Sequence, residues 1–245
     1  MALLRAYMYE FIELLASHLP KKLERAAEKT DTQEDVERIF AGSRIPFKMT
    51  NQILDDRVLD RLFRSARSIH TFGPDPVSDA TLRDLYELVK WGPTAFNSQP
   101  ARYIFVRSAA AKARLAPALS ASNRDKTVAA PVTVIIGYDV EFFSGHCDPT
   151  AGPKMAQLFG GNAEVAIATA FRSGTLQGAY LLIAARALGL AVGPMSGFDA
   201  YAVNREFFPD GRFRANFLAN MGYADDTEPR PRAPRFEFDD VAEVI

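Results

Sequence analysis

Side chains able to bind an anionic, hydrogen-bonding ligand gather in four short segments of this 245-residue chain. The first segment spans residues 66–72 and reads ARSIHTF. In it, Arg67 offers a rigid fork of donors suited to a phosphate dianion. Ser68 adds a hydroxyl donor, and His70 can donate from its ring. Taken alone, the segment is more typical of a solvated helix end.

The second segment, residues 91–100, reads WGPTAFNSQP and lies between a helix that ends at Gly92 and a strand that starts near Arg102. Its polar side chains are Thr94, Asn97, Ser98 and Gln99. Amide side chains both donate and accept, so they suit a ligand edge of alternating donors and acceptors, such as a flavin pyrimidine ring. Ordinary turn chemistry explains the same composition.

The other two segments add a cation and flexible backbone. Asn123 and Lys126 are three residues apart and can share a helical face, where a lysine could stabilise the negative charge of a reduced flavin. Residues 193–199, GPMSGFD, contain Gly193 and Gly197, which permit the backbone to approach a flat ligand closely. The alternatives are a solvated helix face and a tight connection between two helices.

The sequence lacks the motifs of several other kinds of site, namely those for nucleotides, serine hydrolysis, metals and disulfides. The sequence contains neither the glycine-rich dinucleotide motif nor the P-loop, and no nucleophile elbow of the G-x-S-x-G type. The histidines His18, His70 and His146 are far apart, and Cys147 is the single cysteine. A loop explains His146-Cys147-Asp148 better than a metal site, so we expect neither a metal nor a disulfide.

Composition points away from nucleic acid and membrane. The formal net charge is -1, from 29 basic and 30 acidic residues, whereas nucleic-acid binders usually carry a basic excess. The apolar run near residues 180–192 is broken by Arg186 and is too short for a bilayer. Glu10 and Glu13 interrupt what would be a signal peptide. We therefore expect a soluble, cytoplasmic protein.

Hydrophobic periodicity divides the chain into a helical extension, residues 1–48, and a main domain, residues 49–245. Helices are expected over residues 53–67, 79–91, 110–119 and 164–188, and strands over 102–107, 131–138 and 216–223. This order of elements favours an α+β sandwich over a strict βαβ repeat.

In this order the four segments resemble the nitroreductase family. The phrases WGPTAFNSQPAR, LGLAVGPMSGFD and AFRSGTLQGAYLLIAARALG are most similar to its malonic semialdehyde reductase-like subgroup. The resemblance extends from about Met49 to the C-terminus.

The resemblance implies a set of FMN-binding residues. Arg67 and Ser68, with Arg230 and Arg232, match positions that bind the FMN phosphate, and His70 matches a basic position near the flavin. Family members often have a further basic residue where Ala66 stands. The positions that match contacts to the flavin ring are Thr94, Ala95 and Asn97, which serve the partner subunit's site, together with Asn123, Lys126, Pro194, Met195, Ser196 and Gly197. Many relatives have an acidic residue at the position of Ser196, which bears on substrate preference.

The resemblance further implies a mostly antiparallel sheet flanked by helices, in an intertwined homodimer. The expected activity is FMN-dependent, with NADH or NADPH as reductant and a small oxidised substrate such as malonic semialdehyde, in a ping-pong scheme. No catalytic side chain is assigned, because water or an amide-bound substrate could supply the proton. A broad nitro- or quinone reductase and, less favoured, a non-catalytic flavin-binding protein are the alternatives.

Overall fold

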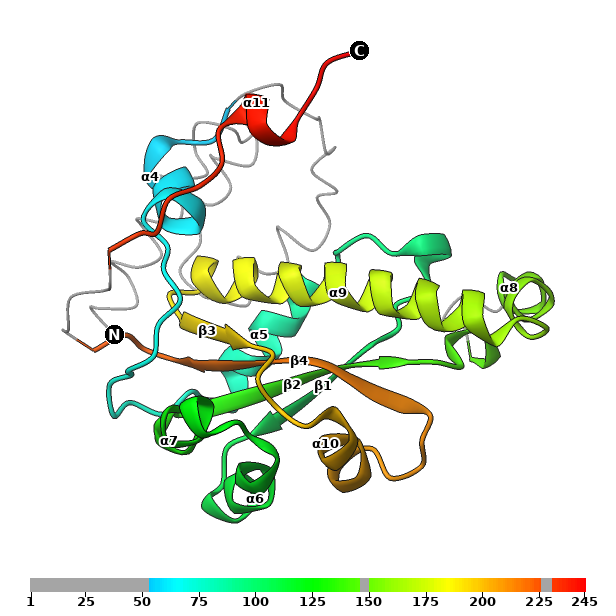
Figure 1. The fold of residues 1–245 in the computed structure, drawn as a ribbon, viewed down its shortest axis with the longest axis horizontal. Helices are drawn as coiled ribbons and strands as arrows, with labels where there is room; N and C mark the ends of the chain where they lie inside the picture. Colours follow the sequence, from blue (N-terminus) through cyan, green and yellow to red (C-terminus); the bar gives the residue numbers. More distant parts are fainter. Residues whose placement is uncertain (1–52, 146–149, 226–230) are drawn as a thin grey trace, which may run out of the picture. The chain divides into compact units, whose positions relative to one another are not determined.

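The computed structural model describes residues 53–145, 150–225 and 231–245. From Leu54 onward these residues form one compact unit, and they confirm the expected α+β class (Figure 1). The extension over residues 1–48, the tripeptide that begins at His146 and Arg230 lie outside the described residues.

A four-stranded antiparallel sheet forms the centre of the unit, in the order β1 (Ala101–Val106), β2 (Val132–Asp139), β4 (Phe213–Gly222), β3 (Ala191–Met195). Every residue of β2 is buried, as its nearly continuous apolar sequence requires for a strand covered on both faces. The outer edge of β3 is met by the segment around Ser68, which forms a parallel bridge to Val192.

Helices cover both faces of the sheet (Figure 1). Helices α5 (Asp79–Val89) and α9 (Ala163–Ala187) lie on one face, where Leu85 and Leu181 join the core formed by alternate residues of β2 and β4. Helices α6 (Ala109–Leu115), α7 (Ala121–Ala129) and α10 (Ala200–Phe207) lie on the other face. The sheet is therefore the middle of three layers.

Shorter elements complete the unit. Helix α4 (Asp56–Leu59) continues into a π-helical turn, η1 (Asp60–Arg64), that contacts α9. Helix α8 (Gly152–Phe159) precedes α9, and α11 (Phe238–Val241) follows the sheet. Three 3-10 turns are η2 (Ala95–Asn97), η3 (Ala116–Ala118) and η4 (Phe142–Ser144). Among the described residues, none of the helices combines the length and apolarity that crossing a membrane requires.

The connection that follows α9 differs from one alternative drawn from the sequence. A direct turn between two helices was one interpretation of residues 193–199, but these residues contain the end of β3 and a short turn into α10. Pro194 is tolerated because β3 lies at the edge of the sheet, where a missing backbone donor does little harm.

Candidate functional site

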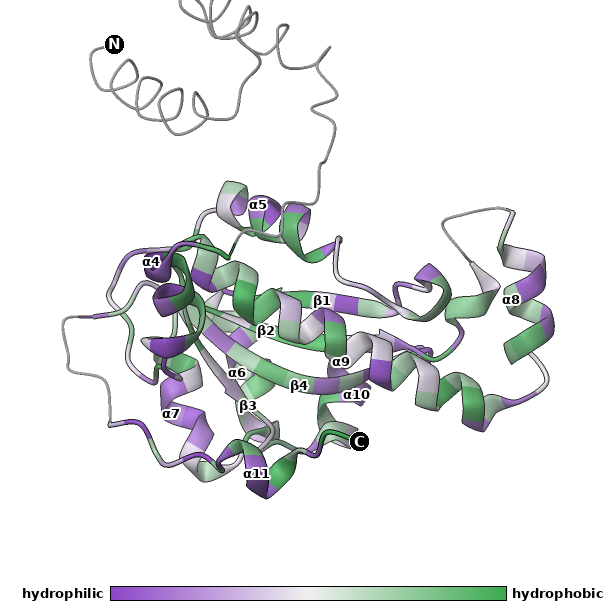
Figure 2. Cartoon of the chain, turned by 90° about the horizontal axis from the view of Figure 1, so that it is seen from above, coloured by the Kyte–Doolittle hydropathy of each residue, from purple (hydrophilic) through white to green (hydrophobic). Residues whose placement is uncertain are grey.

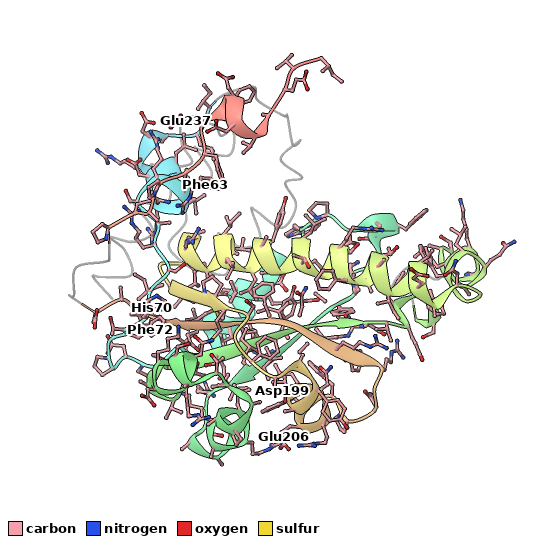
Figure 3. The ribbon with its side chains drawn as sticks, viewed as in Figure 1. Phe63, His70, Phe72, Asp199, Glu206 and Glu237 are labelled. Atoms are coloured by element: carbon pink, nitrogen blue, oxygen red, sulfur yellow. The ribbon has the colours of Figure 1, made fainter. Side chains whose placement is uncertain are left out.

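The first and fourth segments lie side by side. The backbone amide of Ile69 donates to the carbonyl of Val192 at 2.9 Å, next to the bridge formed by Ser68. A Cβ on Gly193 would lie 2.2 Å from the carbonyl oxygen of Ile69, so only glycine permits this approach. His70 thus follows the edge of β3, and Figure 3 labels it at that end of the sheet.

The third segment contacts the fourth. The side-chain amide of Asn123, a buried residue of α7, donates to the carbonyl of Gly197 at 2.9 Å, and the backbone amide of Ser120 donates to the same carbonyl at 3.0 Å. A Cβ on Gly197 would lie 2.6 Å from Nδ2 of Asn123. Helix α7, with Lys126 half-buried on it, is therefore tied to the turn after β3.

Residues 194–196, between the contacts at Gly193 and Gly197, differ in how exposed they are to solvent. Met195 is buried and Pro194 half-buried, whereas Ser196 is exposed. Ser196 is consequently accessible to a ligand that lies along the edge of the sheet.

Cations gather beside the first segment. A cavity of about 180 Å³ is lined by Arg61, Arg67 and Arg186, together with Ala66, Ile69 and residues 189–192. The Nε atoms of Arg67 and Arg186 are buried and have no hydrogen-bond partner among the described residues. Burial, and then the neighbouring charge of Arg232, lower the pKa of Arg186. Among the residues that the structure describes, no carboxylate lines this arginine cavity, so it is suited to an anion.

Arg232 reaches the same place from the C-terminal region. Its Nη2 donates to the carbonyls of Phe63, Arg64 and Ala66, at 3.1, 2.7 and 2.7 Å. Arg67 shares the last of these acceptors through Nη1, at 3.0 Å. The structure thus brings Arg67 and Arg232 together, as the sequence predicts, and Ala66 contributes a carbonyl where relatives often place a basic side chain.

The second segment lies apart from the other three segments, beside β1 at the opposite edge of the sheet from β3. Thr94, Ala95 and Asn97 belong to the loop before β1, and the backbone amide of Ala95 donates to Ser173 on α9 at 3.3 Å. Since β1 and β3 are opposite edges of the sheet, about three strand spacings, on the order of 14 Å, separate the strand that follows this loop from the strand beside the first and fourth segments.

This loop has an unusual backbone. Phe96, Asn97 and Gln99 have φ values of 56°, 53° and 43°, in the left-handed region that non-glycine residues seldom adopt. Ser98, between them, is buried, and its hydroxyl has no hydrogen-bond partner among the described residues. Strained backbone of this kind is concentrated at functional sites, because the surrounding structure must hold it in place.

Three residues of the candidate site escaped the sequence interpretation. Arg61 and Arg186 lie 125 positions apart, and the Nε of Arg61 donates to the carbonyl of Arg186 at 3.0 Å. The one available signal was a charged residue within the apolar run of α9. Ser120 carried no signal, since a serine before a helix is usually a capping residue.

Comparison with known proteins decides the family, because the model of the nitroreductase family matches residues 63–223. The chain belongs to the nitroreductase family. A Stenotrophomonas maltophilia relative, provisionally named NADH dehydrogenase/NAD(P)H nitroreductase, is 51% identical over 197 residues, which cover 78% of this chain and 97% of that protein. A Burkholderia lata relative with the same provisional name is 50% identical over 191 residues, covering 78% of this chain and 98% of its own length.

Solved structures show the same fold. A provisionally named nitroreductase from Bacillus subtilis has a TM-score of 0.68 at 23% identity, covering 78% of this chain and all of that one. Another from Exiguobacterium sibiricum, solved in complex with FMN, has a TM-score of 0.67 at 19% identity, covering 80% of this chain and all of its own. These findings confirm the family and fold predicted from the sequence, and with the family an NAD(P)H-dependent oxidoreductase.

The geometry around β3 fits FMN. The arginine cavity suits its phosphate, and the two buried Nε atoms there have no partner among the described residues. At Gly193 and Gly197 the chain packs too closely for a Cβ, so the backbone that would face the ring is held in place. Asn123 and Lys126 stand beside that backbone on α7.

Proposed function

We propose that this member of the nitroreductase family holds FMN along the edge of β3 and reduces a small oxidised substrate at the expense of NADH or NADPH. The observation that carries the proposal is the convergence of the first, third and fourth segments on that edge, beside the arginine cavity. The bound cofactor would supply hydride transfer between the nicotinamide and the substrate, in a ping-pong scheme.

Arg67, Ser68 and Arg232 would hold the phosphate, with Arg230 joining them as the sequence predicts. Guanidinium groups that lack a carboxylate partner in the described part of the chain can form charge-assisted hydrogen bonds to an incoming dianion. Arg61 and Arg186 line the same cavity and add positive charge around it.

Asn123 and Lys126 would face the pyrimidine edge of the flavin. Lys126 would supply positive charge beside the ring, and little reorganisation would be needed because Asn123 ties α7 to the turn after β3. His70 would lie near the ring, along the segment beside β3. The backbone of residues 194–197 would lie along the flavin and orient the face to which the nicotinamide and the substrate bind in turn.

We propose that the active form is a homodimer in which Thr94, Ala95 and Asn97 complete the site of the partner subunit. Their loop lies at the sheet edge opposite β3, so one chain holds only part of the pocket. Exposed apolar side chains around this loop and α9 support the proposal, because a patch of this kind usually marks an interface. They are Trp91, Phe96, Phe171, Leu176 and Tyr180.

Malonic semialdehyde is the substrate that the sequence resemblance suggests, with 3-hydroxypropanoate as its product. A broad-specificity nitro- or quinone reductase is the second candidate, and the names of relatives that are about 50% identical favour it. Ser196 is exposed where many relatives have an acid, so it is placed to affect which acceptor binds. The cytoplasmic location expected from the sequence stays a prediction.

Steady-state kinetics with three acceptors test the proposal. Rates are measured with NADH and with NADPH against malonic semialdehyde, a nitroaromatic compound and a benzoquinone. A ping-pong enzyme gives parallel lines in double-reciprocal plots at several acceptor concentrations. The acceptor with the highest kcat/KM decides between the two substrates. A protein that binds FMN but oxidises neither nicotinamide would instead be the non-catalytic flavin-binding protein.

A further inference from the structure

Helix α7 carries both residues proposed to face the flavin pyrimidine, yet it is not held in place by apolar packing. Its buried residues are Asn123 and Thr127, both polar, and its largest apolar side chain, Val128, is exposed. Figure 2 shows the same contrast, with α7 mainly hydrophilic beside a mainly hydrophobic sheet. Polar contacts must therefore set where α7 lies, and directional bonds define a position more narrowly than apolar contact does.

The centre of these contacts is Asn220 on β4, which is 1% exposed. In the sheet it pairs with Thr133 on β2 and with Gly193 on β3. Its Oδ1 accepts a hydrogen bond from Oγ1 of Thr133 at 2.7 Å. Its Nδ2 donates to the carbonyl of Lys126 and to Oγ1 of Thr127, both at 3.3 Å.

The same network reaches the strand that would lie along the flavin. Oγ1 of Thr127 donates to the sulfur of Met195 at 3.6 Å, within the stretch proposed to contact the ring. Beyond Thr127, the buried ammonium of Lys112 donates to the carbonyl of Val128 at 2.9 Å and to that of Ala130. Helix α7 is thus tied to the sheet at its middle and to α6 at its end.

We propose that Asn220 is a positioning residue for the flavin site. It fixes the position of α7, and with it Lys126, relative to β3, and so determines how strongly that cation would stabilise reduced FMN. The inference rests on the proposed function. A buried amide that loses its partners costs free energy, so α7 cannot slide or tilt without leaving Asn220 and Thr127 unsatisfied. Asn220 acts through Lys126 and need not touch the cofactor.

The test compares Asn220→Leu with the unaltered full-length protein. Leucine has nearly the same volume but forms none of the three hydrogen bonds. The midpoint potential of bound FMN should become more negative, and reduction by the preferred nicotinamide should slow by on the order of tenfold, as expected for the loss of one or two net hydrogen bonds. Hydrogen exchange of the α7 amides, measured without FMN, should accelerate.

A double-mutant cycle separates positioning from general weakening. In a Lys126→Met background, Asn220→Leu should change the potential no further, because the cation whose place it sets is gone. The matched control is Asn204→Leu. Asn204 is half-buried on α10, and its Oδ1 accepts a hydrogen bond from the amide of Ala215 on β4 at 2.7 Å, so it ties a different helix to the same strand. This control substitution should lower stability and leave the potential and the exchange of α7 unchanged. If Asn220→Leu fails to fold, the isosteric Thr127→Val carries the same test.

The outcomes distinguish this inference from the proposed function. An unaltered potential and unaltered α7 exchange in Asn220→Leu, or shifts that add to those of Lys126→Met, would overturn the positioning role. If the unaltered protein binds no FMN, the proposed function fails, whereas faster exchange of α7 in Asn220→Leu would still show that Asn220 holds the helix. Equal shifts of potential in Asn204→Leu and Asn220→Leu would also overturn the inference.

Discussion

At the scale of single residues, the arginine cavity carries the strongest prediction about ligand binding. Arg232 lies against the end of η1 and shares an acceptor with Arg67, whereas Arg235, three positions later, is exposed and donates to the carbonyls of Ala233 and Pro234. Arg232→Ala should weaken FMN binding by roughly ten- to a hundredfold, since a charge-assisted hydrogen bond to the phosphate would be lost. Fluorescence titration of the apoprotein measures this loss.

Riboflavin and Arg235→Ala are the controls for that change. Riboflavin lacks the phosphate, so its affinity should change little in Arg232→Ala. Arg235→Ala should leave the affinity for FMN near that of the unaltered protein. Equal losses for FMN and riboflavin in both variants would mean that the phosphate does not bind at this cavity.

Asp139 carries a second prediction at this scale, one about stability alone. Its side chain is fully buried and accepts from Arg212 at 2.7 and 2.9 Å and from Arg102 at 3.2 Å. The hydrogen bond to Asp139 is the main cause that raises the pKa of Arg212. Asp139→Ala should lower the free energy of unfolding by about 1–3 kcal/mol, because the hydrogen bonds to a buried carboxylate are lost while the two guanidinium groups left behind remain accessible to water. Urea unfolding measures the loss, and a change below 1 kcal/mol would show that the pair behaves as an exposed one.

Single residues also mark the limit of what the sequence could predict about the site. Arg67 and Ser68 were predictable because they adjoin one another in a motif. Arg61 and Arg186 were not, because only the packing of η1 against α9 brings them to the same cavity. Asn220 looks like any polar residue within a strand, and its role depends on a helix that precedes it by about 90 positions.

At the scale of elements, the turn from β3 into α10 depends on glycine. In Gly197→Ala the new Cβ would lie 2.6 Å from Nδ2 of Asn123 and 2.8 Å from Oγ of Ser120, so these side chains must turn away and the hydrogen bond from Asn123 to the carbonyl of Gly197 is disturbed. We expect a loss of stability of about 1–3 kcal/mol, as for overpacking elsewhere, together with weaker FMN binding. Thermal unfolding with and without FMN measures both effects.

Gly161→Ala is the matched control for this substitution. A Cβ on Gly161 would meet nothing within 4 Å, so the variant should unfold and bind FMN much as the unaltered protein does. Identical behaviour of the two variants would contradict the close approach of α7 to the turn after β3.

Some helices and strands can be predicted from their own sequences, and others cannot. β2 and α9 were predictable because one is a short apolar run of β-branched residues and the other a long helix closed by Gly189. β3 was not predicted, since Gly193 and Pro194 in its five residues are typical of a connection. Its strand conformation comes from pairing with β4 and with the segment around Ser68, which is a tertiary effect.

At the scale of the whole molecule, the site is divided between the two edges of the sheet, which leads to the dimer. Light scattering should give about twice the chain mass at every workable concentration, since association and folding of such dimers are hard to separate. Asn97→Ala should then weaken FMN binding without changing the mass. A monomer with full FMN occupancy would contradict the shared site.

The extension over residues 1–48 should be dispensable. The family match begins at residue 63, and the S. maltophilia relative matches over 97% of its own length while covering 78% of this chain. A chain that begins at Met49 should fold, form dimers and bind FMN as the full chain does, as circular dichroism, light scattering and flavin absorbance would show. Insoluble protein or lost flavin would make the extension an integral part of the fold.

The central claim is that three segments around β3 form an FMN site that a reduced nicotinamide can reach. The visible spectrum of the purified full-length protein, reconstituted with FMN and freed of excess, tests this most directly. Such a site should give the absorbance of oxidised flavin at about one FMN per chain, and NADH or NADPH should bleach it under anaerobic conditions. Protein that retains no flavin, or bound flavin that neither nicotinamide bleaches, would contradict it.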